Sequence, residues 1–442
     1  MEKVYIETYG CQMNFADTEV VMSVLKLAGY EVATEVDDAD FVLINTCAIR
    51  DNAEQRIRHR VRELRALQSR HRGLRIGILG CMAERLADRL MVEEDNVSFV
   101  CGPDAYRRLP QLLGQVRSGG TAADVELSTT ETYADIEPVR LGSNGISAYI
   151  SIMRGCQNYC SYCVVPYTRG RERSRDPQTI VTEAKTLFEA GYREVTLLGQ
   201  NVNSYEWTSD DKEGKVGFPE LMDMVASVSP LLRVRFATSH PKDLSDRLLE
   251  VMASHTNICR CIHLPVQSGS NRMLKLMNRK YTVEWYLDRV DAIRRYLPDC
   301  SITTDVIAGF SGETLEDHQA TLDLFHKVRY DYAFMFKYSE REGTYASRHL
   351  PDDIPDAEKT RRLNEIIALQ GQIALENNRT EIGREYEVLV EGESHRSRER
   401  LFGRNSQNKV LVFDRADAQA GTYRRVRVDD CTAATLIGTL VD

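Results

Sequence analysis

The chain has 442 residues, a formal net charge of -9 and eleven cysteines. This length predicts about two to four domains, the acidic balance confines any nucleic-acid binding to local basic patches, and in a reducing compartment the cysteines predict metal or catalytic sites rather than disulfides. The absence of an apolar run of about 18 residues and of an apolar leader excludes a membrane protein and predicts a cytoplasmic one.

Residues 3–102 alternate short apolar segments with helical ones, the pattern typical of βαβ units and a parallel sheet. Strands are predicted at 3–10, 39–47, 74–81 and 97–102, with a long arginine-rich helix from about Asp51. Cys11, Cys47 and Cys81 come at the ends of the first three strands, and the ends of parallel strands share one sheet edge. A single such cysteine is most often a packing residue. Three in succession predict one shared metal centre, and Cys101, after the fourth strand, is interpreted as structural.

Residues 119–144 are small, polar and acidic and predict a linker between an N-terminal domain, residues 1–118, and the rest of the chain. Six further strands are predicted at 148–153, 194–199, 233–238, 261–265, 301–309 and 332–339, with helices such as Gln178–Ala190 and Val283–Tyr296 between them. Six strand–helix units predict an incomplete (β/α)6 barrel over residues 145–375, with its functional groups in the loops at the strand ends.

The last part of the chain, residues 376–442, comes after a closing helix and consists of short β-rich runs separated by turns. These runs predict a small all-β barrel of the oligonucleotide-binding kind. Its basic side chains cluster and are candidates for contacts with a phosphate backbone: Arg396, Arg398, Arg400, Arg404 and Lys409. A solvated loop is the commoner meaning of such a run. The predicted fold class is thus α/β with three parts: a parallel-sheet domain, a partial barrel and a small β barrel.

The segment "RGCQNYCSYC" places Cys156, Cys160 and Cys163 in a C-x3-C-x2-C run with no fourth cysteine nearby. Three thiolates can anchor three irons of a four-iron cubane and leave the fourth iron open. Zinc with an open position is the alternative, although this spacing is uncommon for it.

With Tyr162 before its last cysteine, this run resembles the signature of radical S-adenosylmethionine enzymes, in which the cofactor's amino and carboxylate groups occupy the open iron. The resemblance implies a cofactor site at the strand ends of the barrel, where the cofactor and cluster carry the radical chemistry. The candidate cofactor-binding residues are Tyr162, Gln200, Asn201, Ser239, Gln267, Ser268, Gly309 and Glu313.

Further motifs along the whole chain are similar to those of the methylthiotransferases: "YGCQMN", "NTCAIR", "GILGCMAE", "CVVPYTRGRERSR" and "GRNSQNKVLVF". The resemblance implies an auxiliary [4Fe-4S] cluster on Cys11, Cys47 and Cys81 whose free iron carries the sulfur to be transferred. It implies a second, radical-generating [4Fe-4S] cluster on the later trio and a C-terminal TRAM domain. One S-adenosylmethionine would methylate the sulfur, and another would supply the radical.

The motifs are most similar to those of the bacterial members that act on tRNA, which implies methylthiolation at C2 of N6-isopentenyladenosine next to the anticodon. Expected partners are that tRNA, an electron donor such as flavodoxin or ferredoxin, and a sulfur or cluster carrier; the chain is expected to be a monomer without membrane contact.

Arg154 stands where some members carry an acid, which we interpret as variation near the substrate channel. Two alternatives stay open: a zinc-stabilised RNA-binding protein, and a methylthiotransferase acting on a ribosomal protein. Candidates for an apolar base pocket, each more often plain core, are Phe236, Phe310, Phe336, Tyr338 and Tyr167.

Overall fold

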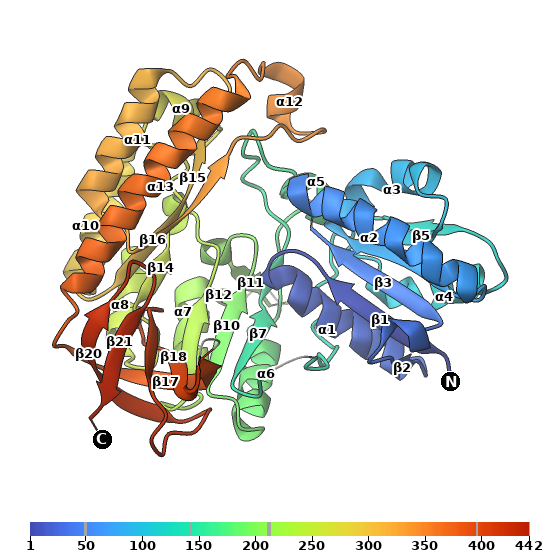
Figure 1. Cartoon of the computed structure of the whole chain (residues 1–442), viewed down its shortest axis with the longest axis horizontal. Helices are drawn as coiled ribbons and strands as arrows, with labels where there is room; N and C mark the ends of the chain where they lie inside the picture. The colour runs from blue at the N-terminus through green and yellow to red at the C-terminus, as the bar shows by residue number, and fades with distance from the viewer. Residues whose placement is uncertain (48–50, 142–143, 210–213, 395–396, 442) are drawn as a thin grey trace.

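The computed structural model describes residues 1–47, 51–141, 144–209, 214–394 and 397–441. Figure 1 shows three units in chain order: an α/β domain in blue, a larger strand–helix barrel from green to orange, and a small β domain in red, with the two termini on opposite sides. Within the described ranges, no helix is long and apolar enough to cross a bilayer.

The N-terminal unit is a six-stranded sheet in the order β2-β1-β3-β4-β5-β6, and every neighbouring pair is parallel, as predicted. Helices α1 and α4 pack on one face, and α2 and α3 pack on the other. The strands are β1 (Lys3–Thr8), β2 (Glu31–Val32), β3 (Phe41–Thr46), β4 (Arg75–Gly80), β5 (Val97–Cys101) and β6 (Ala122–Asp124). The helices are α1 (Gln12–Leu27), α2 (Asp51–Arg70), α3 (Cys81–Glu93) and α4 (Leu109–Arg117).

The segment predicted as a linker, residues 119–144, packs onto this domain over its described part. Its beginning forms β6, which pairs with β5 at the sheet edge. Farther along, Tyr133 and Ile136 are buried against the core under α1 and α4, and the Tyr133 hydroxyl donates to the Pro103 carbonyl at 3.0 Å. Apolar anchors and hydrogen bonds, such as that from the Ser128 amide to Asp104 at 3.1 Å, hold the segment on the domain, which composition alone does not reveal.

The central unit contains the six predicted strands as two parallel sheets of three, β13-β10-β7 and β14-β15-β16, linked by a parallel bridge between Val234 and Ile258. The strands are β7 (Ser147–Ser151), β10 (Glu194–Leu198), β13 (Arg233–Phe236), β14 (Cys261–His263), β15 (Ser301–Ala308) and β16 (Tyr332–Lys337). Two short pairs accompany them: β8 (Met153–Arg154) with β9 (Arg173–Ser174), and β11 (Glu206–Thr208) with β12 (Lys215–Gly217).

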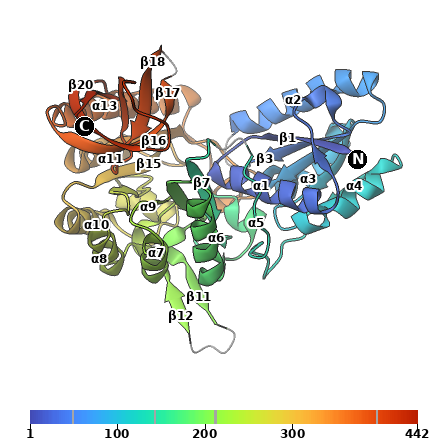
Figure 2. The same ribbon diagram turned by 90° about the horizontal axis from the view of Figure 1, so that it is seen from below.

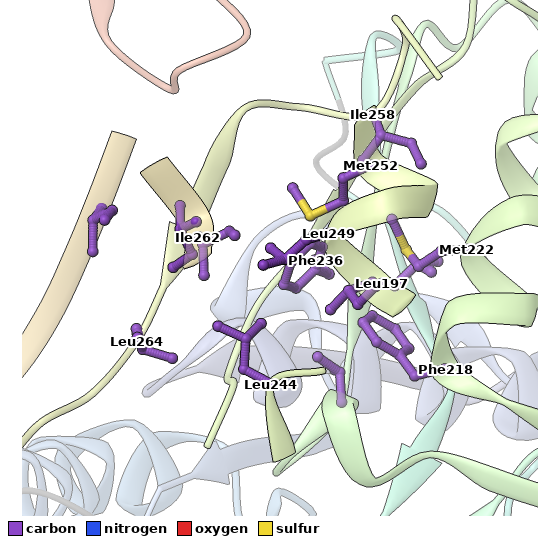
Figure 3. Packing of buried hydrophobic residues seen from close by; sticks show 14 of the residues in the cluster. Leu197, Phe218, Met222, Phe236, Leu244, Leu249, Met252, Ile258, Ile262 and Leu264 are labelled. Atoms are coloured by element: carbon purple, nitrogen blue, oxygen red, sulfur yellow. The ribbon is translucent and has the colours of Figure 1, made fainter. Parts of the chain in front are cut away.

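Helices cover the outside of this partial barrel, because one face of each strand carries apolar side chains. In Figure 3, Leu197 and Phe236 from the strands pack with Phe218 of the helix outside them. The helices are α6 (Pro177–Glu189), α7 (Phe218–Ala226), α8 (Asp246–Ser254), α10 (Val283–Tyr296), α11 (Leu315–Val328) and α13 (Asp356–Arg379), with the short α5 (Val165–Arg169), α9 (Asn271–Leu276) and α12 (Tyr345–His349) in loops.

The inner face of the barrel is covered unequally. On the β7 and β10 side, Tyr149 and Leu198 meet Met13 and Ala16 of α1, so the N-terminal domain packs over the first half of the barrel. Figure 2 shows α1 beside β7 from below. On the second half, Ile307 of β15 packs with residues of α9 and α12, whereas Tyr332 and Phe334 of β16 are 51% and 43% exposed.

The C-terminal unit is a closed barrel in the order β17-β18-β19-β21-β20, with its own apolar core. Strands β19 and β21 pair in parallel, and the other neighbouring pairs are antiparallel. Its strands are β17 (Glu385–Ser394), β18 (Ser397–Arg404), β19 (Val410–Asp414), β20 (Tyr423–Cys431) and β21 (Leu436–Leu440). Alternate residues point inward along each strand, which confirms the predicted small β barrel.

Candidate functional site

The first cysteine trio gathers at the edge of the N-terminal sheet. Cys11 follows β1 and caps α1, Cys47 follows β3, and Cys81 follows β4 and begins α3. These three strands are neighbours in the sheet. A hydrogen bond with Cys47 lowers the pKa of the Cys11 thiol to about 6, while burial raises the pKa of the Cys81 thiol. The thiolate is the form of cysteine that binds metal, so Cys11 is the member of the trio that ionises most readily.

An arginine from the central barrel contacts this trio. Arg169, the last residue of α5, donates from Nε to the Cys81 sulfur at 3.1 Å and from Nη2 to Asp17 at 2.7 Å. All three residues are buried. One guanidinium therefore binds both a candidate cluster ligand and a carboxylate of the N-terminal domain.

Asp17 and Asp104 join the two domains through further buried arginines. Arg154 donates to Asp17 at 2.8 Å and to the Pro103 carbonyl at 2.9 Å, and Arg173 donates to Asp104 at 2.9 Å. Although burial raises the pKa of the Asp17 carboxyl, Arg154 and Arg169 hold it below its ordinary value. Arg154 thus fastens the domain interface, which its interpretation as substrate-channel variation missed, because its partner lies 137 positions away.

The second cysteine trio lies in the loop between β8 and α5. The Cys163 amide donates to the Cys160 carbonyl at 2.9 Å, and Arg279 donates to the Cys160 sulfur at 3.3 Å. Burial, with Cys160 nearby, raises the pKa of the Cys156 thiol to about 11. Gly155 has a φ of +82°, and a Cβ there would lie 1.9 Å from the Arg171 carbonyl oxygen, so the loop requires glycine.

No three His, Cys, Asp or Glu side chains in the described ranges are grouped closely enough to hold a single metal ion. A four-iron cluster takes one cysteine on each of three irons, so its ligands need not meet at one atom.

Several predicted cofactor contacts carry buried polar atoms without a partner. Both amide atoms of Gln200, Oδ1 of Asn201 and Oγ of Ser239 have none, and neither has Nε2 of the neighbouring His240. All follow β10 or β13 at the C-terminal end of the barrel. Because buried polar groups are almost always hydrogen-bonded, this set fits a polar ligand such as the amino, carboxylate and ribose groups of S-adenosylmethionine.

The other predicted cofactor contacts have structural partners. The Ser268 hydroxyl accepts from the Ser270 amide at 3.2 Å and lies 3.5 Å from Thr321. Glu313 accepts from the Gly309 amide and from Arg362, each at 2.8 Å. A Cβ on Gly309 would meet Lys359, and Gln267 holds its chain against β15 through its backbone. Tyr162 packs edge-on against Phe310, with ring centroids 6.2 Å apart.

Two of the predicted RNA contacts form ion pairs, Arg404 within the small β barrel and Lys409 with residues outside it. Arg404 donates to Glu391 at 2.6 Å, and Lys409 binds Glu381 at 2.9 Å and Asp331 at 3.1 Å. Both side chains are therefore ion-paired in the folded chain, and their contact with RNA stays a prediction. Arg398 and Arg400 are exposed, and Arg400 lies 3.2 Å from Asp414. Arg396 lies outside the described residues.

Most candidates for a base pocket are core residues. Phe310 is fully buried, and Phe236 and Tyr338 are nearly so. Phe336 is half-buried and Tyr167 is exposed, so only these two present a ring surface to a ligand.

Three family models match the chain: the Uncharacterized protein family UPF0004 at residues 3–102, the Radical SAM superfamily at 150–325 and the TRAM domain at 379–441. Curated relatives named tRNA-2-methylthio-N(6)-dimethylallyladenosine synthase match nearly the full length. The Bacteroides thetaiotaomicron protein is 57% identical, covering 99% of this chain and 96% of its own, and the Parabacteroides distasonis protein is 53% identical, covering 100% and 96%.

Among solved structures, the radical S-adenosylmethionine methyltransferase TsrM from Kitasatospora setae, with cobalamin and a [4Fe-4S] cluster bound, has a TM-score of 0.58 at 14% identity. The alignment covers 78% of this chain and 77% of that one and supports the fold. The radical SAM match favours the enzyme over a zinc-stabilised RNA-binding protein. The chain belongs to the methylthiotransferase family of radical S-adenosylmethionine enzymes, in the branch of the tRNA-2-methylthio-N(6)-dimethylallyladenosine synthases.

Proposed function

We propose that this chain transfers a methylthio group to C2 of N6-isopentenyladenosine next to the anticodon of tRNA. The relatives' shared name, the radical SAM match and the RNA-binding TRAM domain support this activity over modification of a ribosomal protein. The observation that carries it is the Arg169 contact with Cys81, because Arg169 lies six residues beyond Cys163. The segment that holds one trio therefore reaches the other, as a reaction that uses both would require.

In this proposal Cys11, Cys47 and Cys81 hold the auxiliary [4Fe-4S] cluster, and the later trio, Cys156, Cys160 and Cys163, holds the radical-generating one. When bound, the two clusters and S-adenosylmethionine supply the transferred sulfur, the methyl group and the one-electron reduction that starts radical chemistry. The protein's part is positioning. Arg169 orients the Cys81 thiol, and Arg279 does the same for Cys160.

The unpartnered polar atoms of Gln200, Asn201 and Ser239 are assigned to S-adenosylmethionine. The Asn201 amide donates to Asp243 at 2.7 Å, which fixes its side chain and leaves the oxygen free to accept from an ammonium group. Tyr162, packed on Phe310, closes one side of the cysteine loop with apolar surface and limits the access of water.

For the partners, we assign the exposed Arg398 and Arg400 to the tRNA backbone. A flavodoxin or ferredoxin would supply electrons and a carrier protein would restore sulfur, with the enzyme acting as a monomer in the cytoplasm, where tRNA is modified.

Nucleoside mass spectrometry tests the function. Anaerobically reconstituted protein, given S-adenosylmethionine, a reductant and tRNA that carries N6-isopentenyladenosine, should produce 2-methylthio-N6-isopentenyladenosine. A Cys160→Ala variant should still bind the tRNA but form no product. If wild-type protein with near two clusters per chain leaves the nucleoside unchanged, the proposal is wrong.

A further inference from the structure

Three aromatic side chains line the inner face of the last barrel strand. In β16, Tyr332, Phe334 and Phe336 alternate with Ala333, which packs into the core under the helices. Because side chains alternate between the two faces of a strand, all three rings point into the barrel. Their neighbours across β15 face the same way: Thr303, Asp305 and Ile307.

These rings are unusually exposed for large aromatic residues inside a barrel. Tyr332 is 51% exposed and Phe334 is 43% exposed, and their rings meet edge-on with centroids 5.0 Å apart. Phe334 also meets His263 edge-on at 5.8 Å. Water therefore reaches a row of flat rings that folding has not buried, and an exposed apolar surface of this kind marks a binding site.

The row of Tyr332, Phe334 and Phe336 lies between the small β barrel and the second cysteine trio. At its lower end, Asp331 binds Lys409 of the β barrel at 3.1 Å, so the TRAM domain is fixed beside Tyr332. Beyond its upper end, Tyr338 packs on Phe310 at 4.8 Å, and Phe310 faces Tyr162 of the second cysteine trio. The inner face of β16 therefore lies between the small β barrel and the second cysteine trio.

We propose that the inner face of β16, with Tyr332 and Phe334 as its stacking surfaces, binds unpaired bases of the tRNA anticodon loop beside the modified adenosine. The inference rests on the proposed function and adds the part of the enzyme that holds the neighbouring nucleotides. Single-stranded RNA is recognised by aromatic rings that stack on bases and by polar groups at their edges. Here the polar groups are His263, which contacts Thr303 at 3.0 Å, and Asp305, 3.4 Å from His263.

The test measures the affinity of Tyr332→Ala and Phe334→Ala for an anticodon stem-loop that carries N6-isopentenyladenosine, by fluorescence anisotropy with the cluster-loaded enzyme. Loss of one base stack should weaken binding by about five-fold to a hundred-fold. Phe334→Tyr should keep the affinity, and Phe334→Leu, apolar but not flat, should lose it. Trp285→Ala is the matched control, because Trp285 is 44% exposed on α10, on the outside of the barrel.

Three results distinguish a failure of the stacking inference from a failure of the proposed function. The stacking inference is wrong if both alanine variants and Phe334→Leu keep the stem-loop affinity of the wild type. If the wild-type protein also forms the methylthio product, the proposed function still holds. Equal losses in Trp285→Ala would overturn the stacking inference too, since the effect would not be specific to the inner face. If the wild-type protein formed no methylthio product, the proposed function would fail first.

Discussion

The buried carboxylate of Asp17 should hold the N-terminal domain against the barrel, and Asp17→Asn is the change that tests this. The Asp17 side chain is 1% exposed and accepts from Arg154 and Arg169, whose side chains are 2% and 4% exposed. The asparagine keeps the size of the side chain but leaves two buried guanidiniums without their shared anion.

Removing one partner from a buried ion pair costs about 3–5 kcal/mol. Here Arg154 keeps Asp104 at 3.5 Å, and Arg169 keeps the Cys81 sulfur, so neither cation is left wholly alone. We therefore expect the lower end, about 3 kcal/mol, which corresponds to roughly a hundred-fold larger population of the opened interface because about 1.4 kcal/mol is a factor of ten.

Hydrogen exchange of the cluster-free protein measures this population through the amides of β8 and α5, which lie at the interface. Asp135→Asn is the control, because Asp135 pairs with Arg107 at 3.0 Å on the surface, where an ion pair contributes about 0–1 kcal/mol. If exchange at β8 and α5 is as slow in Asp17→Asn as in Asp135→Asn, the buried ions do not hold the domains together.

Three other outcomes are expected. Lys409→Ala, which breaks contacts with Asp331 and Glu381, should make the C-terminal barrel more easily cleaved by protease while the rest of the chain resists. Burial, helped by Asp104 and Asp124, raises the pKa of Glu84 from 4.5 to about 8. As pH rises, the Glu84 carboxyl ionises in the unfolded chain near pH 4.5, before it ionises in the folded chain. The free energy of unfolding of the wild type therefore decreases as pH rises from about 4.5 to about 8, and the Tm of Glu84→Gln relative to that of the wild type should increase over the same range. Cys101→Ala should keep the iron content of the wild type, since Cys101 is buried in the core.

Local patterns predicted the elements well, and they predicted that three cysteines lie at the ends of neighbouring strands. The apolar period placed α10 at residues 283–296, the same bounds as in the structure, and six strands of the barrel where they occur. Convergence of Cys11, Cys47 and Cys81 followed from one physical rule, that parallel strands end at a common edge. These inferences succeed because each depends on residues close in sequence or on the common direction of the strands in a parallel sheet.

Counter-ions and exposure could not be predicted in the same way. The basic run that contains Arg404 and Lys409 does not reveal that the fold places Glu391 and Asp331 beside these two side chains. Tyr332 and Phe334 have the alternation of an ordinary core strand, and only the incomplete closure of the barrel leaves their rings in water. Both depend on which distant segment covers a side chain.

The contact between Arg169 and Cys81 shows why such pairings matter for function. A planar guanidinium can donate in two directions at once, here from Nε to a sulfur and from Nη2 to the Asp17 carboxylate. A lysine at this position would carry the same charge on a single nitrogen, without the rigid fork that spans both partners. Because Arg169 shares its segment with the second trio, any shift of that loop would move the hydrogen bond on Cys81. The two cysteine trios are therefore connected through one side chain, although they lie in different domains.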